Sequence, residues 1–190
     1  METPRVEAGV VEACRRGDRD AFRVLFEAYK DRVYSIALHY SGNEVAAHDI
    51  AQDVFVKLFK AMRRFRGDSS FDTWLYRMVV NACTDAYRRT RKWVAMGDEW
   101  SSVPDPHREP MEDRLQRRMV QAAVQKAVQR LSPRLRMPVV LRYVQGLSYD
   151  EIARALGCSK GTVASRLNRA HKQLARRLAH LEETGERRDV

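Results

Sequence analysis

The sequence predicts an all-α protein made of two small helical domains joined by a flexible linker. Apolar residues recur at helical spacing along most of the 190-residue chain, and no convincing stretch alternates apolar with polar residues. Glycine and proline, which interrupt helices, number only nine and six. The helical pattern is lost over residues 93–111, where three prolines and several acidic residues predict the linker.

The first domain is expected to span residues 18–92, after a short opening helix over Val6–Arg15. Asp18 or Asp20 can cap the first of its three helices, and Gly42 is placed to end it. The apolar face of this helix is formed by residues at helical spacing: Phe22, Leu25, Phe26, Tyr29, Val33, Ile36, Ala37 and Tyr40.

The other two helices of this domain flank a polar break at residues 66–70. The helix before the break runs from Glu44 to Met62, and Ser69 with Asp72 can cap the helix after it. Trp74 is expected to pack in the core. The inward face of the earlier helix is predicted to consist of Ile50, Val54, Leu58, Phe59 and Met62.

The second domain is expected to span residues 112–182. Its first helix reaches Leu131, and Ser132 followed by Pro133 is a cap with proline at the first helical position. Pro138 should kink the next helix or delay its start, because proline lacks the backbone N–H that a helix interior needs.

The segment from Ser148 to Arg177 has the spacing of a helix-turn-helix. Ser148 and Glu151 form the pattern of a capping box at the start of its first helix. Gly157 suits a sharp turn, and Ser159 can cap the second helix. The inner face of that second helix is predicted to be Val163, Leu167, Ala170 and Leu174.

The outer face of this last helix bears cations and no acidic residue: Lys160, Arg166, Arg169, Lys172, Arg176 and Arg177. A basic helix after such a turn is shaped for the major groove of DNA. The alternative is a plain helical hairpin with a solvated basic face. The agreement of caps, turn glycine and one sign of charge favours DNA binding.

The overall composition agrees with a polyanionic partner. The net charge is +10 and the isoelectric point is about 9.9, which favours nucleic acid or an anionic membrane. No apolar run is long enough to span a bilayer, and the N-terminus lacks the pattern of a secretory signal, so we expect a soluble cytoplasmic protein. Cys14, Cys83 and Cys158 lie far apart, which predicts reduced thiols and no metal or cofactor site.

Three segments together resemble a known family. They are AHDIAQDVFVKLFKAM at 47–62, FRGDSSFDTWLYRMVVNACTDAYRR at 65–89, and LSPRLRMPVVLRYVQGLSYDEIARALGCSKGTVASRLNRAHKQL at 131–174. In this order and spacing they resemble bacterial RNA polymerase sigma factors of the extracytoplasmic-function group of the sigma-70 family. The resemblance implies a promoter-specificity subunit without enzymatic activity or cofactor.

The resemblance also implies a division of labour between the domains. The first would be sigma domain two, which docks on the clamp of the largest polymerase subunit and captures the −10 element as a single strand. The second would be sigma domain four, which reads the −35 element as duplex and rests on the flap of the second-largest subunit. An anti-sigma factor is common in this family, although nothing in the sequence specifies one.

Each predicted interface has its candidate residues. The surface for core polymerase is expected to be a polar strip opposite the core face of its helix, where complementary charge would orient docking; the alternative is an ordinary solvated face. The strip comprises Asp49, Gln52, Asp53 and Val56. The −35 contacts are expected on the helix-turn-helix at Ser159, Lys160, Gly161, Thr162, Ser165, Arg166, Arg169 and Lys172.

The −10 strand is expected on the polar loop and on the helix that follows it. Phe65 or Phe71 could stack on a flipped base, Gly67 would let the backbone approach it, and arginines would hold phosphates. The candidate set is Arg64, Phe65, Gly67, Asp68, Ser69, Phe71, Arg77, Asn81, Asp85 and Arg88.

Three other kinds of protein share some of these features. A stand-alone dimeric regulator would share the helix-turn-helix, but the polar loop before Phe71 would have no function in it. An enzyme on nucleic acid lacks a phosphate-binding glycine loop, a metal cluster and a nucleophile with its base. A membrane-surface protein would need a helix that pairs a basic face with an exposed apolar one.

Overall fold

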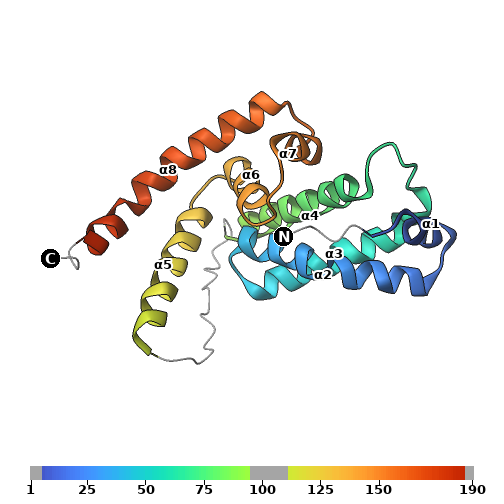
Figure 1. The fold of residues 1–190 in the computed structure, drawn as a ribbon, viewed down its shortest axis with the longest axis horizontal. Helices are drawn as coiled ribbons and strands as arrows, with labels where there is room; N and C mark the ends of the chain where they lie inside the picture. The colour runs from blue at the N-terminus through green and yellow to red at the C-terminus, as the bar shows by residue number, and fades with distance from the viewer. Residues whose placement is uncertain (1–5, 95–110, 187–190) are drawn as a thin grey trace.

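The computed structural model describes residues 6–94 and 111–186, and within these ranges the regular structure is helical throughout (Figure 1). The all-α prediction is confirmed. Helices α1 to α4 form the first domain, and α5 to α8 form the second. Most of the predicted linker, residues 95–110, lies outside the described residues. Among the described helices, none combines the length and the apolar character needed to cross a membrane.

The first two helices are α1, Ala8–Arg16, and α2, Arg19–Ser41. Of the two predicted caps for α2, the structure uses Asp18, whose carboxylate accepts hydrogen bonds from the backbone of Asp20 at 2.8 Å and of Ala21 at 3.0 Å. Gly42 ends α2 in the left-handed conformation, with φ of 71°.

The remaining helices of this domain are α3, Glu44–Ala61, a short 3₁₀ turn η1, Met62–Arg64, and α4, Phe71–Val94. The predicted cap of α4 was wrong by one residue. The hydroxyl of Ser70, rather than Ser69, accepts from the backbone N–H of Thr73 at 3.3 Å and also bonds the hydroxyl of Thr73 at 2.9 Å. The core between α2, α3 and α4 includes Leu25, Val33, Ile36, Val54, Leu58 and Val79.

The second domain consists of α5, Met111–Gln129, α6, Pro133–Tyr143, α7, Tyr149–Leu156, and α8, Lys160–Glu186. Helix α6 begins at Pro133 and continues through Pro138, so the start of the helix is not delayed. The core of this domain includes Leu131, Leu141, Ile152, Val163, Leu167 and Ala170.

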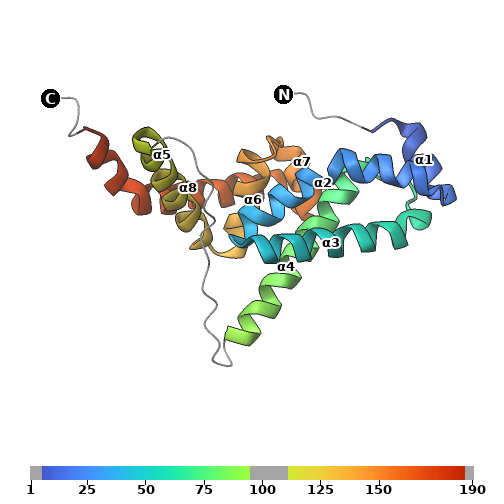
Figure 2. The same cartoon turned by 90° about the horizontal axis from the view of Figure 1, so that it is seen from below.

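The two domains lie against each other (Figures 1 and 2). Helix α7 contacts α4, α6 contacts both α2 and α4, and α5 contacts α2. Their buried apolar residues belong to one continuous cluster that includes members of both domains. The sequence pattern predicted two separate units and did not indicate this contact.

Candidate nucleic-acid and polymerase interfaces

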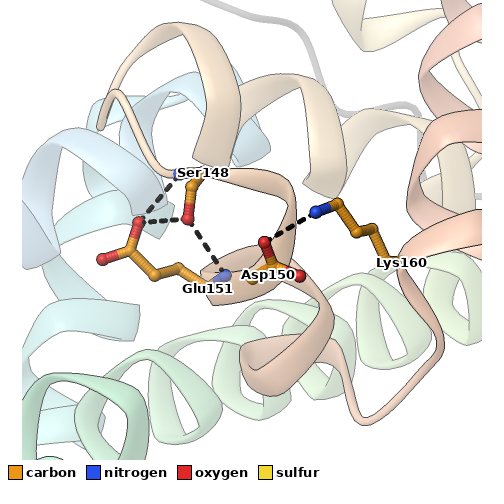
Figure 3. Close-up of polar contacts among 4 residues, drawn as sticks. All are labelled: Ser148, Asp150, Glu151 and Lys160. Carbon is orange, nitrogen blue, oxygen red and sulfur yellow. Dashed lines mark hydrogen bonds and ion pairs between the residues drawn. The ribbon is translucent and has the colours of Figure 1, made fainter.

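The helix-turn-helix is built as its local pattern predicted. The carboxylate of Glu151 accepts from the backbone N–H of Ser148 at 2.8 Å and from its hydroxyl at 2.7 Å, while that hydroxyl accepts from the N–H of Glu151 at 3.3 Å (Figure 3). This capping box satisfies backbone donors at the start of α7, which is only eight residues long. Gly157 then turns the chain with φ of 62°, and the hydroxyl of Ser159 accepts from the N–H of Thr162 at 3.2 Å.

Helix α8 presents the predicted −35 residues on its outer side. Val163, Leu167 and Ala170 are buried against the domain and hold the helix in place. Six of the eight candidates are exposed, whereas Thr162 and Arg166 are half-buried. The exposed candidates are Ser159, Lys160, Gly161, Ser165, Arg169 and Lys172.

Two of these cations have partners within the helix-turn-helix. The ammonium of Lys160 forms an ion pair with the carboxylate of Asp150 at 2.8 Å, across the turn between α7 and α8 (Figure 3). The guanidinium of Arg166 lies 3.8 Å from the sulfur of Cys158. Sequence inspection missed Asp150, because its ten-residue separation from Lys160 has no meaning until the turn brings the helices together.

The polar loop between η1 and α4 borders a cavity of about 770 Å³. Phe71 is half-buried and lines this cavity. Phe65 also lines it, but only 9% of its surface is exposed, and its ring packs against Trp74 with centroids 4.8 Å apart. The other walls come from α1, through Val11 and Glu12, and from α7. The remaining loop candidates Gly67, Asp68 and Ser69 also line the cavity, and Arg64 is exposed.

A buried tyrosine, Tyr29, fixes the start of α4 beneath this loop. The phenol of Tyr29 donates to the carboxylate of Asp72 at 2.6 Å, and the guanidinium of Arg32 lies 3.8 Å from the same oxygen. Burial, followed by this hydrogen bond, raises the pKa of Tyr29 well above its ordinary value. The phenol therefore remains a neutral donor and anchors α4 to α2.

Helix α4 carries the other −10 candidates along one exposed face. Arg77, Asn81, Asp85 and Arg88 recur at helical spacing, and all four are exposed. The guanidinium of Arg88 lies 3.8 Å from the carboxylate of Asp85. Arg77 has a partner from the second domain, because its Nε donates to the backbone carbonyl of Arg154 on α7 at 2.9 Å.

The predicted polymerase strip lies on α3 beside an apolar groove. Asp49, Gln52 and Val56 are exposed, and the half-buried Asp53 pairs with Lys57 at 2.8 Å. Gln52 and Val56 also line a cavity of about 890 Å³ between α2 and α3. Its apolar lining includes Phe22, Phe26, Tyr34, Phe55 and Phe59.

The sequence pattern had assigned Phe59 to the core, and that prediction was wrong. Half of its side chain, 51%, is exposed, and its ring meets Phe22 edge to face with centroids 5.0 Å apart. Helical spacing alone does not distinguish a residue in the core from one in a surface groove at the edge of the same face.

Comparison with known proteins agrees with this geometry. The family model for sigma-70 region 2 matches residues 25–93, and the model for sigma-70 region 4 matches residues 121–174. The chain is 30% identical to the RNA polymerase sigma-H factor of Pseudomonas aeruginosa, over 95% of this chain and 98% of that protein. It is 31% identical to the ECF RNA polymerase sigma-E factor of Escherichia coli, over 87% and 90% of the two chains.

A solved structure shares the fold. The sigma factor RpoE of Bartonella quintana, crystallised with the anti-sigma factor NepR, superposes with a TM-score of 0.67 at 24% identity. The match covers 83% of this chain and 96% of that one. Sigma factors are transcription initiation factors and not enzymes. The two matched regions, and the identity to sigma factors along nearly their whole length, show that this chain belongs to the extracytoplasmic-function sigma factors of the sigma-70 family.

Proposed function

We propose that this sigma factor selects promoters by holding the −35 element as duplex on α8 and the −10 element as single strand at α4 and the loop before it. The main support for this proposal is that one chain has two different polar surfaces. One is the exposed outer side of α8, the helix that follows the capped helix α7 and its turn. The other is a loop-bordered cavity next to a separate polar helix face.

The outer side of α8 suits duplex DNA. Arg169 and Lys172 are exposed, and the first turn of α8 presents small polar residues that allow close approach to base edges. An arginine that grips guanine with two hydrogen bonds contributes about 1–3 kcal/mol of discrimination. Lys172, further along the helix, is placed for phosphate.

The loop before α4 suits an unpaired base. Phe71 offers an aromatic ring at the wall of the cavity, and Gly67 has φ of 78° with open space around it, so backbone groups there are accessible. Stacking on an aromatic ring contributes about 1–3 kcal/mol per base. Because Phe65 is only 9% exposed whereas Phe71 is half-buried, Phe71 is the better placed of the two rings.

Docking on core polymerase is assigned to α3 and the groove beside it. The polar strip supplies charge for orientation, and the aromatic groove supplies apolar area that a helix of the clamp could bury. Domain four would rest on the flap. An anti-sigma factor is proposed as a further partner because the Bartonella quintana neighbour was solved with one. Work with polymerase would place the protein in the cytoplasm.

Run-off transcription with purified core polymerase on a pool of random promoters tests this proposal. Specific transcripts that require the protein would support it, and their upstream sequences would give both elements. Arg169→Ala should weaken initiation that depends on the −35 element by about tenfold or more while leaving core binding unchanged. An equal loss of core binding would refute the assignment of α8. Binding to duplex operators without any polymerase-dependent transcript would favour the stand-alone regulator.

A further inference from the structure

Phe71, the ring proposed to stack on the flipped base, packs against three other aromatic rings. It is the first residue of α4, and it meets Tyr29, Phe65 and Trp74 edge to face, with centroids 5.4, 6.0 and 6.0 Å away. Phe65 belongs to the loop before α4, and Trp74 belongs to α4 itself. Of these three rings, only that of Tyr29 comes from another helix, so Tyr29 places Phe71 relative to α2.

Tyr29 is also bonded to the residue that follows Phe71. Its phenol donates to the carboxylate of Asp72 at 2.6 Å, and the guanidinium of Arg32 lies 3.8 Å from the same oxygen. That guanidinium also lies over the ring of Tyr29, 5.2 Å from its centroid. Tyr29 and Arg32 both belong to α2, so two side chains of one helix hold the first turn of the other.

This contact borders the cavity proposed to receive the base. Tyr29, Phe71 and Asp72 all line it. Phe71 is half-buried, whereas Tyr29 is only 2% exposed and offers no open ring face on which a base could stack. Tyr29 can therefore affect the base only through the ring of Phe71 that it touches.

The first turn of α4 needs such contacts because the first N–H groups of a helix have no partner within it, and helix ends fray. The hydroxyl of Ser70 accepts from the N–H of Thr73 at 3.3 Å. The phenol of Tyr29 holds the side chain of Asp72 through a hydrogen bond to a charged acceptor, which is stronger than a neutral one. Without this bond, the turn that carries Phe71 loses its polar contact with α2, and the ring samples a wider range of positions.

We propose that Tyr29 is a positioning residue for base capture. Through its ring and its bond to Asp72, it fixes Phe71 in the place where a flipped base of the −10 strand stacks. The inference rests on the proposed function of α4 and its loop as the −10 site. It concerns the part of the affinity that comes from the stacked base, and it leaves the contacts to the phosphates of the strand unchanged.

The test compares a −10 single strand with the same strand lacking one base. Core polymerase is saturated with each sigma variant, and binding of a labelled non-template strand from a promoter selected in the run-off experiment is measured by fluorescence anisotropy. An abasic site is moved along the strand. The captured base is the one whose removal weakens binding to the wild type but not to Phe71→Ala. At that position, the ratio of the affinities for the intact and the abasic strand measures what the base contributes.

Four further variants isolate the bond. Tyr29→Phe removes the hydroxyl and keeps the ring. Asp72→Ala removes the acceptor, whereas Asp72→Asn keeps an oxygen that can accept from the phenol; both delete the same charge, so their difference reports the bond alone. Tyr40→Phe is the control, because Tyr40 is also 2% exposed and also lies on α2 but does not line the cavity.

We expect the ratio to fall about fivefold in Tyr29→Phe and in Asp72→Ala, since part of the stacking contribution is lost. The ratio should match the wild type in Asp72→Asn and in Tyr40→Phe. Tyr29→Phe should bind the abasic strand as tightly as the wild type does, which also shows that this variant folds and binds core polymerase.

An unchanged ratio in Tyr29→Phe, an equal loss on both strands, or equal ratios in the two Asp72 variants would overturn the positioning role. A different result would count against the site itself. If no abasic site weakened binding to the wild type, or if Phe71→Ala left that weakening unchanged, the proposed −10 pocket would be wrong.

Discussion

Asp150→Asn should make the protein bind duplex DNA more tightly and with a steeper dependence on salt. Asp150 holds the ammonium of Lys160 at 2.8 Å, at the start of the helix proposed to enter the major groove. When DNA approaches, its phosphates must compete with this carboxylate for the ammonium of Lys160. It would also lie near the DNA as a negative charge that repels the backbone. Its removal frees one cation and deletes one anion.

The size of the effect follows from exposure and charge. The side chains of Asp150 and Lys160 are 58% and 62% exposed, so the pair itself contributes about 0.2–1 kcal/mol. One additional phosphate contact steepens the dependence of log affinity on log salt by about 0.9. Lowering the salt fourfold, from about 200 mM to about 50 mM, should therefore tighten binding by the variant about threefold more than binding by the wild type.

A salt titration with a short duplex of random sequence, followed by fluorescence anisotropy, measures the affinity for DNA and the dependence of that affinity on salt. Glu27→Gln is the matched control, because Glu27 also pairs with a lysine, Lys30 at 2.6 Å, but lies on α2 of the other domain. It deletes one negative charge away from α8. If both variants showed the same slope and affinity as the wild type, Asp150 would neither hold Lys160 away from DNA nor repel the phosphate backbone. If both gained equally, overall charge would explain the effect.

Two further predictions concern stability. Ser148→Ala removes the hydroxyl from the capping box and should lower the free energy of unfolding by about 1 kcal/mol, measured by urea denaturation with Ser165→Ala as an exposed control on α8. Burial raises the pKa of the Cys83 thiol to about 12. The unfolded chain loses this proton first as the pH rises above about 9, so stability should fall with a slope of up to about 1.4 kcal/mol per pH unit. Cys83→Ala should reduce that slope between about pH 9 and about pH 10, and an unchanged slope would show that the thiol does not titrate there.

The features that were predictable from the sequence are those that depend on neighbours along the chain. The capping box at Ser148 and Glu151, the turn at Gly157 and the buried face of α8 all follow from spacing of a few residues. Local chemistry misplaced one cap, because Ser69 was predicted to precede α4 and the structure uses Ser70. The choice of Ser70 depends on the hydroxyl of Thr73, which turns toward it.

The features that escaped prediction depend on contacts between distant segments. Arg136 looks in the sequence like any surface cation, and only the approach of α2 and α4 buries it. Phe59 repeats with the core residues of α3, yet it lies at the edge of that face and opens into a groove. Periodicity reports which side of a helix is apolar, but not which neighbour covers that side.

The close approach of Gln129 to Gly42 also has an evolutionary consequence. Gly146 and Gly157 are restricted only by their own backbone conformation, since open space surrounds both. Asparagine, which tolerates that conformation, should replace either of them without any change elsewhere. At position 42 the neighbouring domain restricts the space as well. Among relatives that keep the same domain contact, a side chain at position 42 should therefore accompany a shorter residue at position 129, so that the two positions vary together.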